Sequence, residues 1–303
     1  GSSLHSVAKI LNKKGVIEQP RVFAKLGQLY GYHQRIKYGE FLISKEDSYL
    51  RVYDRIIKGE NVKYPITFVE GEHMYHYAKL IEEKRLGKAS TFLKLVRDKK
   101  IIKKLLKKDL ESLEGYLFPD TYHFSKNDTE LLIVATMVNK FLEETETLNF
   151  NKLGLDRHKA ITLASIVEKE TGASFERRKI SSVFHNRLKK NMRLQTDPTI
   201  LYGIMDKTGV ETNNIRKKDI MDKTRYNTYV IKGLPPGPIA SPGLEAIKAA
   251  LNPEETSYLY FVSKNDGTHV FTNNYKDHQK AVKHFQLNPK MRKGKSWRDL
   301  KKK

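Results

Sequence analysis

The fold of this chain is decided by residues 160–172, which read AITLASIVEKETG. At 100° per residue the apolar side chains of this stretch fall on one broad arc, and Glu168 falls on the same arc. Asp156 is placed to cap the first turn, and Gly172 follows the last turn, where a left-handed residue is favoured. The pattern therefore predicts a buried helix. Its solvent side is marked by two residues, Ser165 and Lys169.

A carboxylate on a buried stripe is unfavourable, so Glu168 must be paired, protonated or open to a cleft. An apolar cleft favours the protonated carboxyl, which is the state that a general acid needs. The alternative is a structural glutamate bridged to an arginine of the next helix. The helix alone leaves both interpretations open. Glu170 lies two residues on and cannot share the face of Glu168, so the two do not form a side-by-side pair.

Length and composition predict a folded protein with room for two domains. The chain has 303 residues, of which 39% are hydrophobic, and this is sufficient for packed cores. Its formal net charge of +22 predicts attraction to polyanions, although lysine runs such as residues 99–108 are typical of a solvated surface. No RRM, KH, helix-turn-helix or zinc-finger signature is present, so no nucleic-acid partner is predicted.

Several chemistries are excluded by what the sequence lacks. The absence of cysteine excludes disulfides, thiol nucleophiles and cysteine-based metal sites. His73 and His76 lie three residues apart without the third and fourth ligands of a zinc site, so no metal is predicted. Motifs of serine hydrolases, P-loop proteins, zinc proteases and dinucleotide-binding folds are also missing. What remains is acid–base chemistry by a carboxylate.

Helical and extended segments occur together along the chain, which predicts an α+β fold. The first small α+β unit runs to about residue 63. A strand follows at residues 62–68, where Pro65 suits a sheet edge. The helix after this strand can be laid over the first helix of the chain, with residues 71–81 matching residues 1–11. This match suggests two related short modules.

The second half is richer in specific loops, which are predicted at residues 192–199, 225–229 and 233–243. Residues 113–122, LEGYLFPDTY, cannot form a regular helix and predict a rigid aromatic segment, which suits either a sugar-binding surface or a small satellite core. Residues 233–243 are too rich in proline for a helix or a central strand, and predict an ordered wall. Residues 258–271 predict a hairpin with its turn at Asn265-Asp266-Gly267.

A further helix is predicted from Ser174 through Leu188, with Arg187 inside its apolar arc. A buried guanidinium needs an anion nearby, and Glu168 or Glu170 is the obvious candidate. If Glu168 were that partner, it would be a poor acid. The sequence leaves this question open.

Seven blocks, taken in order, resemble the endolytic murein transglycosylase family (MltG/YceG-like). They are residues 113–122, 164–171 (ASIVEKET), 182–188 (SVFHNRL), 192–199 (MRLQTDPT), 226–229 (YNTY), 233–243 (GLPPGPIASPG) and 258–262 (YLYFV). The resemblance covers the chain from about residue 65 to residue 280, and the N-terminal segment is similar to the LysM-like region of that family. It implies the following organisation: a LysM-like α+β module at residues 1–63, a second LysM-like or linking module at 64–110, a catalytic domain at 111–285 and a basic tail at 286–303.

The resemblance implies a bacterial enzyme that cuts nascent peptidoglycan strands between MurNAc and GlcNAc, leaves a 1,6-anhydromuramoyl end and terminates strand elongation. It implies Glu168 as the single general acid and base, because attack by the muramoyl 6-hydroxyl needs no activated water. No metal or organic cofactor is implied. Two alternatives remain. One is a hydrolytic muramidase with Glu114 or Asp197 as its second carboxylate, and the other is a non-catalytic scaffold that binds peptidoglycan or polyanions.

Five polar residues are predicted around the cleft as substrate contacts: Glu114, Asn186, Gln195, Tyr226 and Asn227. The Pro235-Pro236 segment is predicted as a wall. The resemblance also implies a single-pass protein of the bacterial inner membrane, with its catalytic part in the periplasm and cell-wall synthesis proteins as possible partners. No apolar window is long enough to span a bilayer, and the chain begins at Gly1 without methionine, so an N-terminal span is expected to have been removed.

Overall fold

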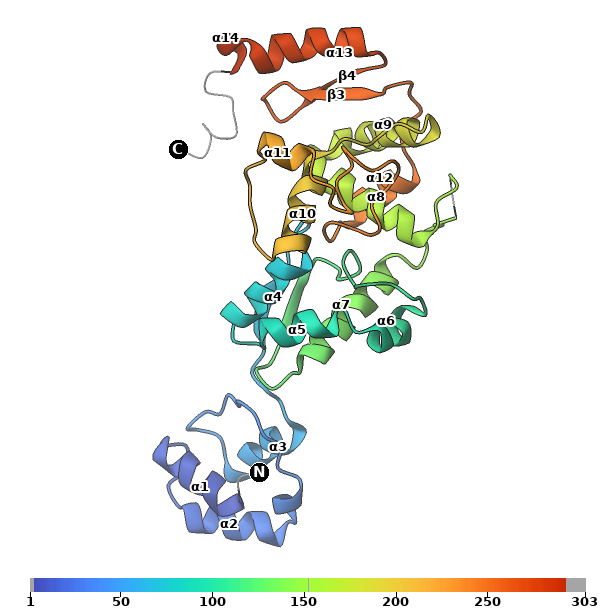
Figure 1. Ribbon diagram of the computed structural model, residues 1–303. Helices are drawn as coiled ribbons and strands as arrows, with labels where there is room; N and C mark the ends of the chain where they lie inside the picture. The colour runs from blue at the N-terminus through green and yellow to red at the C-terminus, as the bar shows by residue number, and fades with distance from the viewer. Residues whose placement is uncertain (1–2, 152, 293–303) are drawn as a thin grey trace.

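The structure, a computed structural model, describes residues 3–151 and 153–292. The chain is elongated, with the N-terminal helices at one end and a β-hairpin with its covering helices at the other (Figure 1). Helices predominate, and the named strands form two separate two-stranded antiparallel sheets. This arrangement agrees with the predicted α+β class.

The N-terminal unit is a small helical cluster with its own core. Its elements are α1 (Leu4–Lys13), α2 (Pro20–Leu29), the 3₁₀ helix η1 (Tyr32–Gln34) and α3 (Tyr49–Lys58). Ser3 and Ser48 cap α1 and α3 by accepting backbone N–H bonds, and Pro20 begins α2, where a missing N–H costs nothing. The core centres on Phe23, which stacks on Tyr53 with ring centroids 4.1 Å apart.

The second unit begins with a strand and is built mainly from helices. Its elements are β1 (Tyr64–Thr67), α4 (Met74–Glu83), α5 (Ala89–Leu95), α6 (Lys99–Leu106), β2 (Thr121–Phe124) and α7 (Glu130–Glu144). β1 pairs antiparallel with β2, with Tyr64 opposite Phe124. Pro65 is accommodated because each strand of this sheet has a free edge. The predicted repeat also places buried residues alike: Leu4, Ala8 and Leu11 of α1 correspond to Met74, Ala78 and Ile81 of α4.

The remaining elements make up the rest of the chain, with one buried helix at their centre and a β-hairpin with its helices at the far end (Figure 1). They are α8 (Arg157–Glu170), η2 (Ser174–Glu176), α9 (Arg177–Lys189), α10 (Asp197–Thr208), α11 (Lys217–Ile220), α12 (Leu244–Leu251), β3 (Tyr260–Ser263), β4 (His269–Thr272), α13 (Tyr275–Val282), the π-helical η3 (Lys283–Leu287) and α14 (Pro289–Arg292). α8 packs against α9, α10 and α12. Asp156 caps α8 as predicted, and the predicted hairpin is present as β3 and β4.

Three expectations about this region are corrected. Ser165 is fully buried, and its hydroxyl is satisfied there because it donates to the Thr162 carbonyl and accepts from the Ile239 N–H. Gly172 is not left-handed; instead α8 ends where Thr171 becomes extended, with φ −145° and ψ 136°. Residues 192–199 were expected to be loop, yet α10 begins at Asp197, with Pro198 in its first turn.

One large core joins the chain on both sides of the predicted boundary between residues 110 and 111. It contains Ile66 and Phe92 from one side and Val134 and Val167 from the other. The boundaries at 63, 110 and 285 and the LysM-like character of the first modules stay predictions. Residues 293–303 of the predicted basic tail lie outside the described residues. No helix in the described ranges is both long and apolar enough to cross a bilayer.

Candidate active site

Two glutamates at the C-terminal end of α8 point to different environments. Glu168 lies toward the start of α9 and the start of α12, where Arg177 and Gly243 contact it. Glu170, the last residue of α8, lies toward the loop that precedes α10, where Thr196 contacts it. The separation follows from helix geometry, because residues two apart face opposite sides.

Both oxygens of Glu168 are engaged. Oε1 lies 2.8 Å from Nη2 of Arg177, and Oε2 accepts the Gly243 N–H at 3.0 Å. The Glu168 side chain is only 6% exposed and that of Arg177 is 13% exposed. This is the structural interpretation that the sequence left open, a glutamate bridged to an arginine of the next helix. Both oxygens of Glu168 are therefore engaged inside the protein, so neither is free to meet a substrate.

Glu170 has a different set of neighbours. Its carboxyl accepts a hydrogen bond from the Thr196 hydroxyl, and among the described residues no cation lies within ion-pair distance of it. Burial raises the pKa of the Glu170 carboxyl to about 7; the nearby Asp197 charge acts in the same direction, and the Thr196 hydrogen bond opposes it. A partly buried carboxyl that is protonated near neutral pH is suited to general acid chemistry.

The loop before α10 presents polar groups next to Glu170. Gln195 and Asp197 are exposed, and Gln195 is held in a left-handed conformation with φ +51°. Tyr229 donates to Asp197 Oδ1 at 2.7 Å, and Thr228 accepts the Thr196 N–H at 3.1 Å. The motifs QTDPT and YNTY, far apart in sequence, therefore meet beside the last turn of α8.

Of the five predicted substrate contacts, only Gln195 is exposed beside Glu170. Asn186 donates to the carbonyls of Thr256 and Tyr258, and Asn227 donates to three carbonyls around residues 219–222. Tyr226 is 5% exposed and packs on Tyr202. Through these contacts, the side chains of Asn186 and Asn227 hold loops in place. Their role toward substrate stays a prediction.

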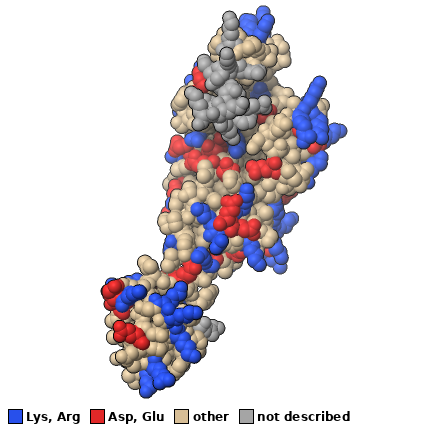
Figure 2. Space-filling model, turned by 90° about the vertical axis from the view of Figure 1, so that its left-hand side faces the viewer, with Lys and Arg blue, Asp and Glu red and all other residues tan. Residues whose placement is uncertain are grey.

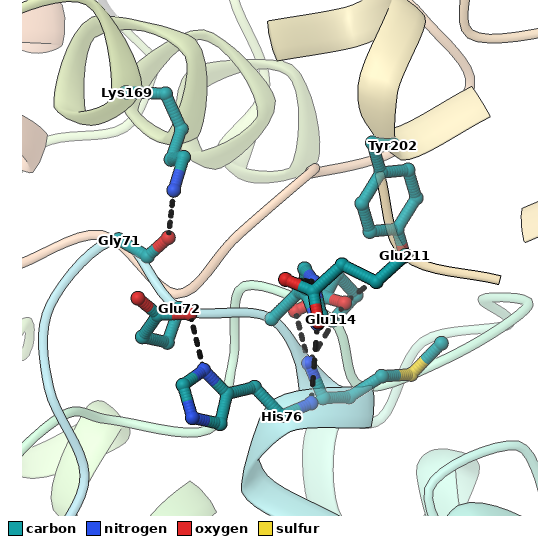
Figure 3. Close-up of polar contacts among 9 residues, drawn as sticks. Gly71, Glu72, His76, Glu114, Lys169, Tyr202 and Glu211 are labelled. Atoms are coloured by element: carbon teal, nitrogen blue, oxygen red, sulfur yellow. Dashed lines mark hydrogen bonds and ion pairs between the residues drawn. The ribbon is translucent and has the colours of Figure 1, made fainter. Parts of the chain in front are cut away.

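Glu114 is also engaged inside the protein. Both of its oxygens lie within 3.2 Å of the Met74 N–H at the start of α4, and Tyr202 donates to Oε2 at 3.0 Å. The side chain is 1% exposed, and burial raises its pKa to about 7. Figure 3 shows Glu114 beneath Tyr202 on one side, and Lys169 reaching the Gly71 carbonyl on the other. Glu114 thus links α4 to α10.

The aromatic segment at residues 113–118 lies in the main core. Tyr116, Leu117 and Phe118 are at most 8% exposed, so this segment forms a core instead of a sugar-stacking surface. The predicted proline-rich wall is ordered, and Pro236 and Pro238 line a cavity of about 190 Å³ together with His158 and Tyr226.

Arg187 does not pair with either glutamate through a hydrogen bond. Its guanidinium donates to the carbonyls of Leu259, Arg193 and Leu194 and stacks over Tyr260. Backbone carbonyls satisfy the buried cation here, which the sequence could not indicate. Figure 2 shows basic and acidic side chains mixed over one face of the molecule, as expected for a solvated surface.

Three residues of this region were missed at the level of sequence. Arg177 opens α9 and Glu70 lies in the connection from β1 to α4, and neither position carries a motif that would single it out. Thr196 belongs to a quoted block, but its bond to Glu170 depends on the fold. Glu170 itself is considered in the sequence only as a residue off the face of Glu168 and as a candidate partner of Arg187.

Comparison with known proteins shows the family to which this chain belongs. The model of the YceG-like family matches residues 1–284, so the chain belongs to the YceG-like family. A relative named endolytic murein transglycosylase, from Bacillus subtilis (strain 168), is 35% identical over 94% of this chain and 82% of the relative.

A second relative with the same name, from Streptococcus pneumoniae (strain R6), is 29% identical over 93% of this chain. This chain spans 56% of the length of that relative. Among solved structures, a crystal structure of a yceG-like protein from Listeria monocytogenes has a TM-score of 0.62 and 30% identity, covering 92% of this chain and 95% of that one.

Proposed function

We propose that this protein is an endolytic lytic transglycosylase that cleaves peptidoglycan glycan strands between MurNAc and GlcNAc. The support is membership of the YceG-like family together with relatives that carry this name. The single structural observation that carries the proposal is the Glu170 carboxyl at the edge of an exposed polar loop. Burial raises its pKa to about 7, although the charge of Arg187 acts in the opposite direction, and in the described part of the chain no cation lies within ion-pair distance of it.

The reaction needs one group that gives a proton and then takes one. The protonated carboxyl donates its proton to the glycosidic oxygen as the bond from that oxygen to C1 of MurNAc breaks. The resulting carboxylate then accepts the proton of the muramoyl 6-hydroxyl as O6 bonds to C1. The product is a 1,6-anhydromuramoyl end, and the free 4-hydroxyl of GlcNAc leaves with the other fragment.

The sequence assigns this role to Glu168, and the contacts favour Glu170. An acid must present a free oxygen to its substrate, whereas both oxygens of Glu168 are occupied, one by Arg177 and the other by the Gly243 N–H. Glu170 has no such partner among the described residues, and it adjoins Gln195 and Asp197, from whose side a glycan can approach.

The experiment compares Glu170→Gln and Glu168→Gln on uncross-linked glycan strands, with mass spectrometry of the products. We expect the wild type to produce anhydromuramoyl ends and Glu170→Gln to lose roughly 10³-fold in rate, the contribution typical of acid–base catalysis. Strand binding by Glu170→Gln should persist. Equal activity of Glu170→Gln and wild type would contradict the assignment.

A hydrolytic muramidase is the second candidate, and one observation favours it. Asp197 lies close enough to Glu170 to raise its pKa, so a second carboxylate is present that could activate water. The same digest distinguishes the two reactions, because hydrolysis leaves reducing ends. In either case the substrate places the site of action outside the cytoplasmic membrane, with an N-terminal span and partners in wall synthesis as parts of the proposal.

A further inference from the structure

Glu168, the glutamate of α8 that the proposed reaction does not use, is held by a cluster of charged residues. Arg177 Nη2 lies 2.8 Å from Glu168 Oε1 and 3.8 Å from Glu70 Oε2. One guanidinium therefore serves two carboxylates. The Glu70 side chain is 50% exposed, so this cluster extends from the buried end of α8 to the surface.

The contacts of this cluster join four parts of the chain. Arg177 is the first residue of α9, and Gly243 is the residue before α12. Glu70 belongs to residues 69–73, which we call the strap, between β1 and α4. The strap exchanges backbone hydrogen bonds with Ser241, from the Gly71 N–H at 2.8 Å and to the Glu72 carbonyl at 2.9 Å.

These contacts converge on the last turn of α8. Lys169 donates to the Gly71 carbonyl at 2.9 Å, and a side chain at Gly71 would begin 3.5 Å from Cγ of Glu168. The helix ends at Glu170, and Thr171 is already extended. The direction of the Glu170 side chain is consequently set by a terminal turn that no following helical turn supports.

We propose that Glu168 is a positioning residue: its ion pair with Arg177 and its bond to Gly243 fix the last turn of α8 and so aim the Glu170 carboxyl. Glu70 is the outer carboxylate that shares Arg177. This inference rests on the proposed function, since it assumes that Glu170 is the acid.

The charged groups around Glu168 come from every element packed against it. They are Arg177 from α9, Glu70 from the strap and Lys169 from α8 itself, with Glu245 of α12 near Glu70. Burial raises the pKa of Glu70, and the charge of Glu168 adds to that effect. Two carboxylates that repel each other are held together by the guanidinium between them.

The test measures kcat, KM and the pH profile of the full chain carrying Glu168→Gln, Arg177→Met, Arg177→Lys or the double change Glu168→Gln/Arg177→Met. We expect kcat to fall roughly 100-fold in Glu168→Gln and in Arg177→Met, with KM nearly unchanged. A displacement of the Glu170 carboxyl by about 1 Å is sufficient for such a loss. The double variant should be no worse than either single, and Arg177→Lys should recover part of the rate.

The pH profile of kcat distinguishes a positioning role of Glu168 from a role as the acid. If Glu168 only aims Glu170, the alkaline limb stays where the wild type has it in all four variants. If Glu168 were the acid, loss of the Arg177 charge would destabilise its anion and move that limb to higher pH. Glu72→Gln is the matched control, because Glu72 lies on the strap and bonds to His76 at 2.6 Å without contacting Arg177. It should keep the wild-type rate.

Three results would overturn the inference. They are a Glu168→Gln rate as low as that of Glu170→Gln with the fold intact, an alkaline limb that moves in Arg177→Met, and wild-type kcat in both single variants. If Glu168→Gln does not fold, the two Arg177 variants decide the outcome. Failure of the proposed function is recognised separately, because the wild type itself would then release no glycan fragments.

Discussion

The same raised pKa has different consequences at two glutamates. Burial raises the pKa of both Glu114 and Glu170 to about 7. Glu114 is 1% exposed and bonded to the Met74 N–H and Tyr202, so substrate cannot reach it without rearrangement of the core. Glu170 borders the exposed residues of the loop before α10. A shifted pKa identifies a function only when access accompanies it.

The Glu114 carboxyl should make stability fall as the pH rises. Its pKa is about 7 in the folded protein against an ordinary value of 4.5, so the folded state binds the proton more tightly. Its stabilising effect is complete below about pH 4.5 and is lost as the pH rises through 7. Glu114→Gln cannot titrate and should flatten the profile of unfolding free energy by at most about 3 kcal/mol between pH 4.5 and 7.5.

Denaturant unfolding at a series of pH values checks this prediction. In Glu114→Gln, the remaining dependence of unfolding free energy on pH should come from Glu170, which titrates in the same range. Glu170→Gln is the control that removes this second contribution. A profile for Glu114→Gln that runs parallel to the wild type throughout would contradict the prediction.

The sequence singles out the last turns of α8 and assigns the acid to Glu168, but the contacts that distinguish Glu168 from Glu170 could not be predicted from residue patterns. Periodicity placed Glu168 correctly on a buried arc, where its side chain is 6% exposed. What occupies the space beside it depends on the turn at residues 171–176, which brings Arg177 back onto α8. Thr196, which contacts Glu170, comes from a loop 26 residues away. Such contacts are tertiary and leave no periodic signal.

At the scale of elements, Gly115 permits a close approach between loops. Its φ is +81°, and a Cβ there would lie 2.5 Å from the Pro238 ring and 2.9 Å from Cγ2 of Ile161. Neither neighbour can yield easily, because one is a ring and the other belongs to α8. The aromatic segment, the proline-rich wall and α8 therefore meet at a point without a side chain.

Gly115→Ala should lower the melting temperature by roughly 5 °C or more. Overpacking of a core costs about 1–3 kcal/mol, and the left-handed backbone adds roughly 1 kcal/mol. Gly154→Ala provides the matched control, since Gly154 has φ +74° and a Cβ added there would meet nothing within 4 Å, so this variant bears the backbone cost alone. Equal melting temperatures of the two variants would show that the close contact with Pro238 and Ile161 adds nothing to the loss of stability.

Local signals predicted most elements and few of their pairings. The cap at Asp156 and the turn at Asn265-Asp266-Gly267 were sufficient for α8 and the hairpin of β3 and β4. α10 was missed, because Asp197-Pro198 reads as a turn although proline is equally favourable at a helix start. The pairing of β1 with β2 joins strands separated by three helices, and nothing in either strand specifies its partner.

At the scale of the whole molecule, two separate cores are joined by a polar contact region. Glu40 of the N-terminal unit accepts from Lys126 at 2.8 Å and from Tyr64 at 2.6 Å. The cores themselves contain different residues, with Phe23 in one and Phe92 in the other. Exposed polar contacts contribute little to stability, so the two units should unfold with little mutual coupling.

Phe23→Ala and Phe92→Ala test this independence by calorimetry. Each phenylalanine is fully buried, and its truncation should cost about 3–5 kcal/mol in its own unit. We expect two transitions, of which Phe23→Ala lowers only one and Phe92→Ala only the other. Glycan cleavage should survive Phe23→Ala at temperatures where the N-terminal unit has melted, because α8 and the loop before α10 pack on the larger core. A single transition that both variants shift equally would mean that the polar contact region couples the units far more strongly than its exposed contacts allow.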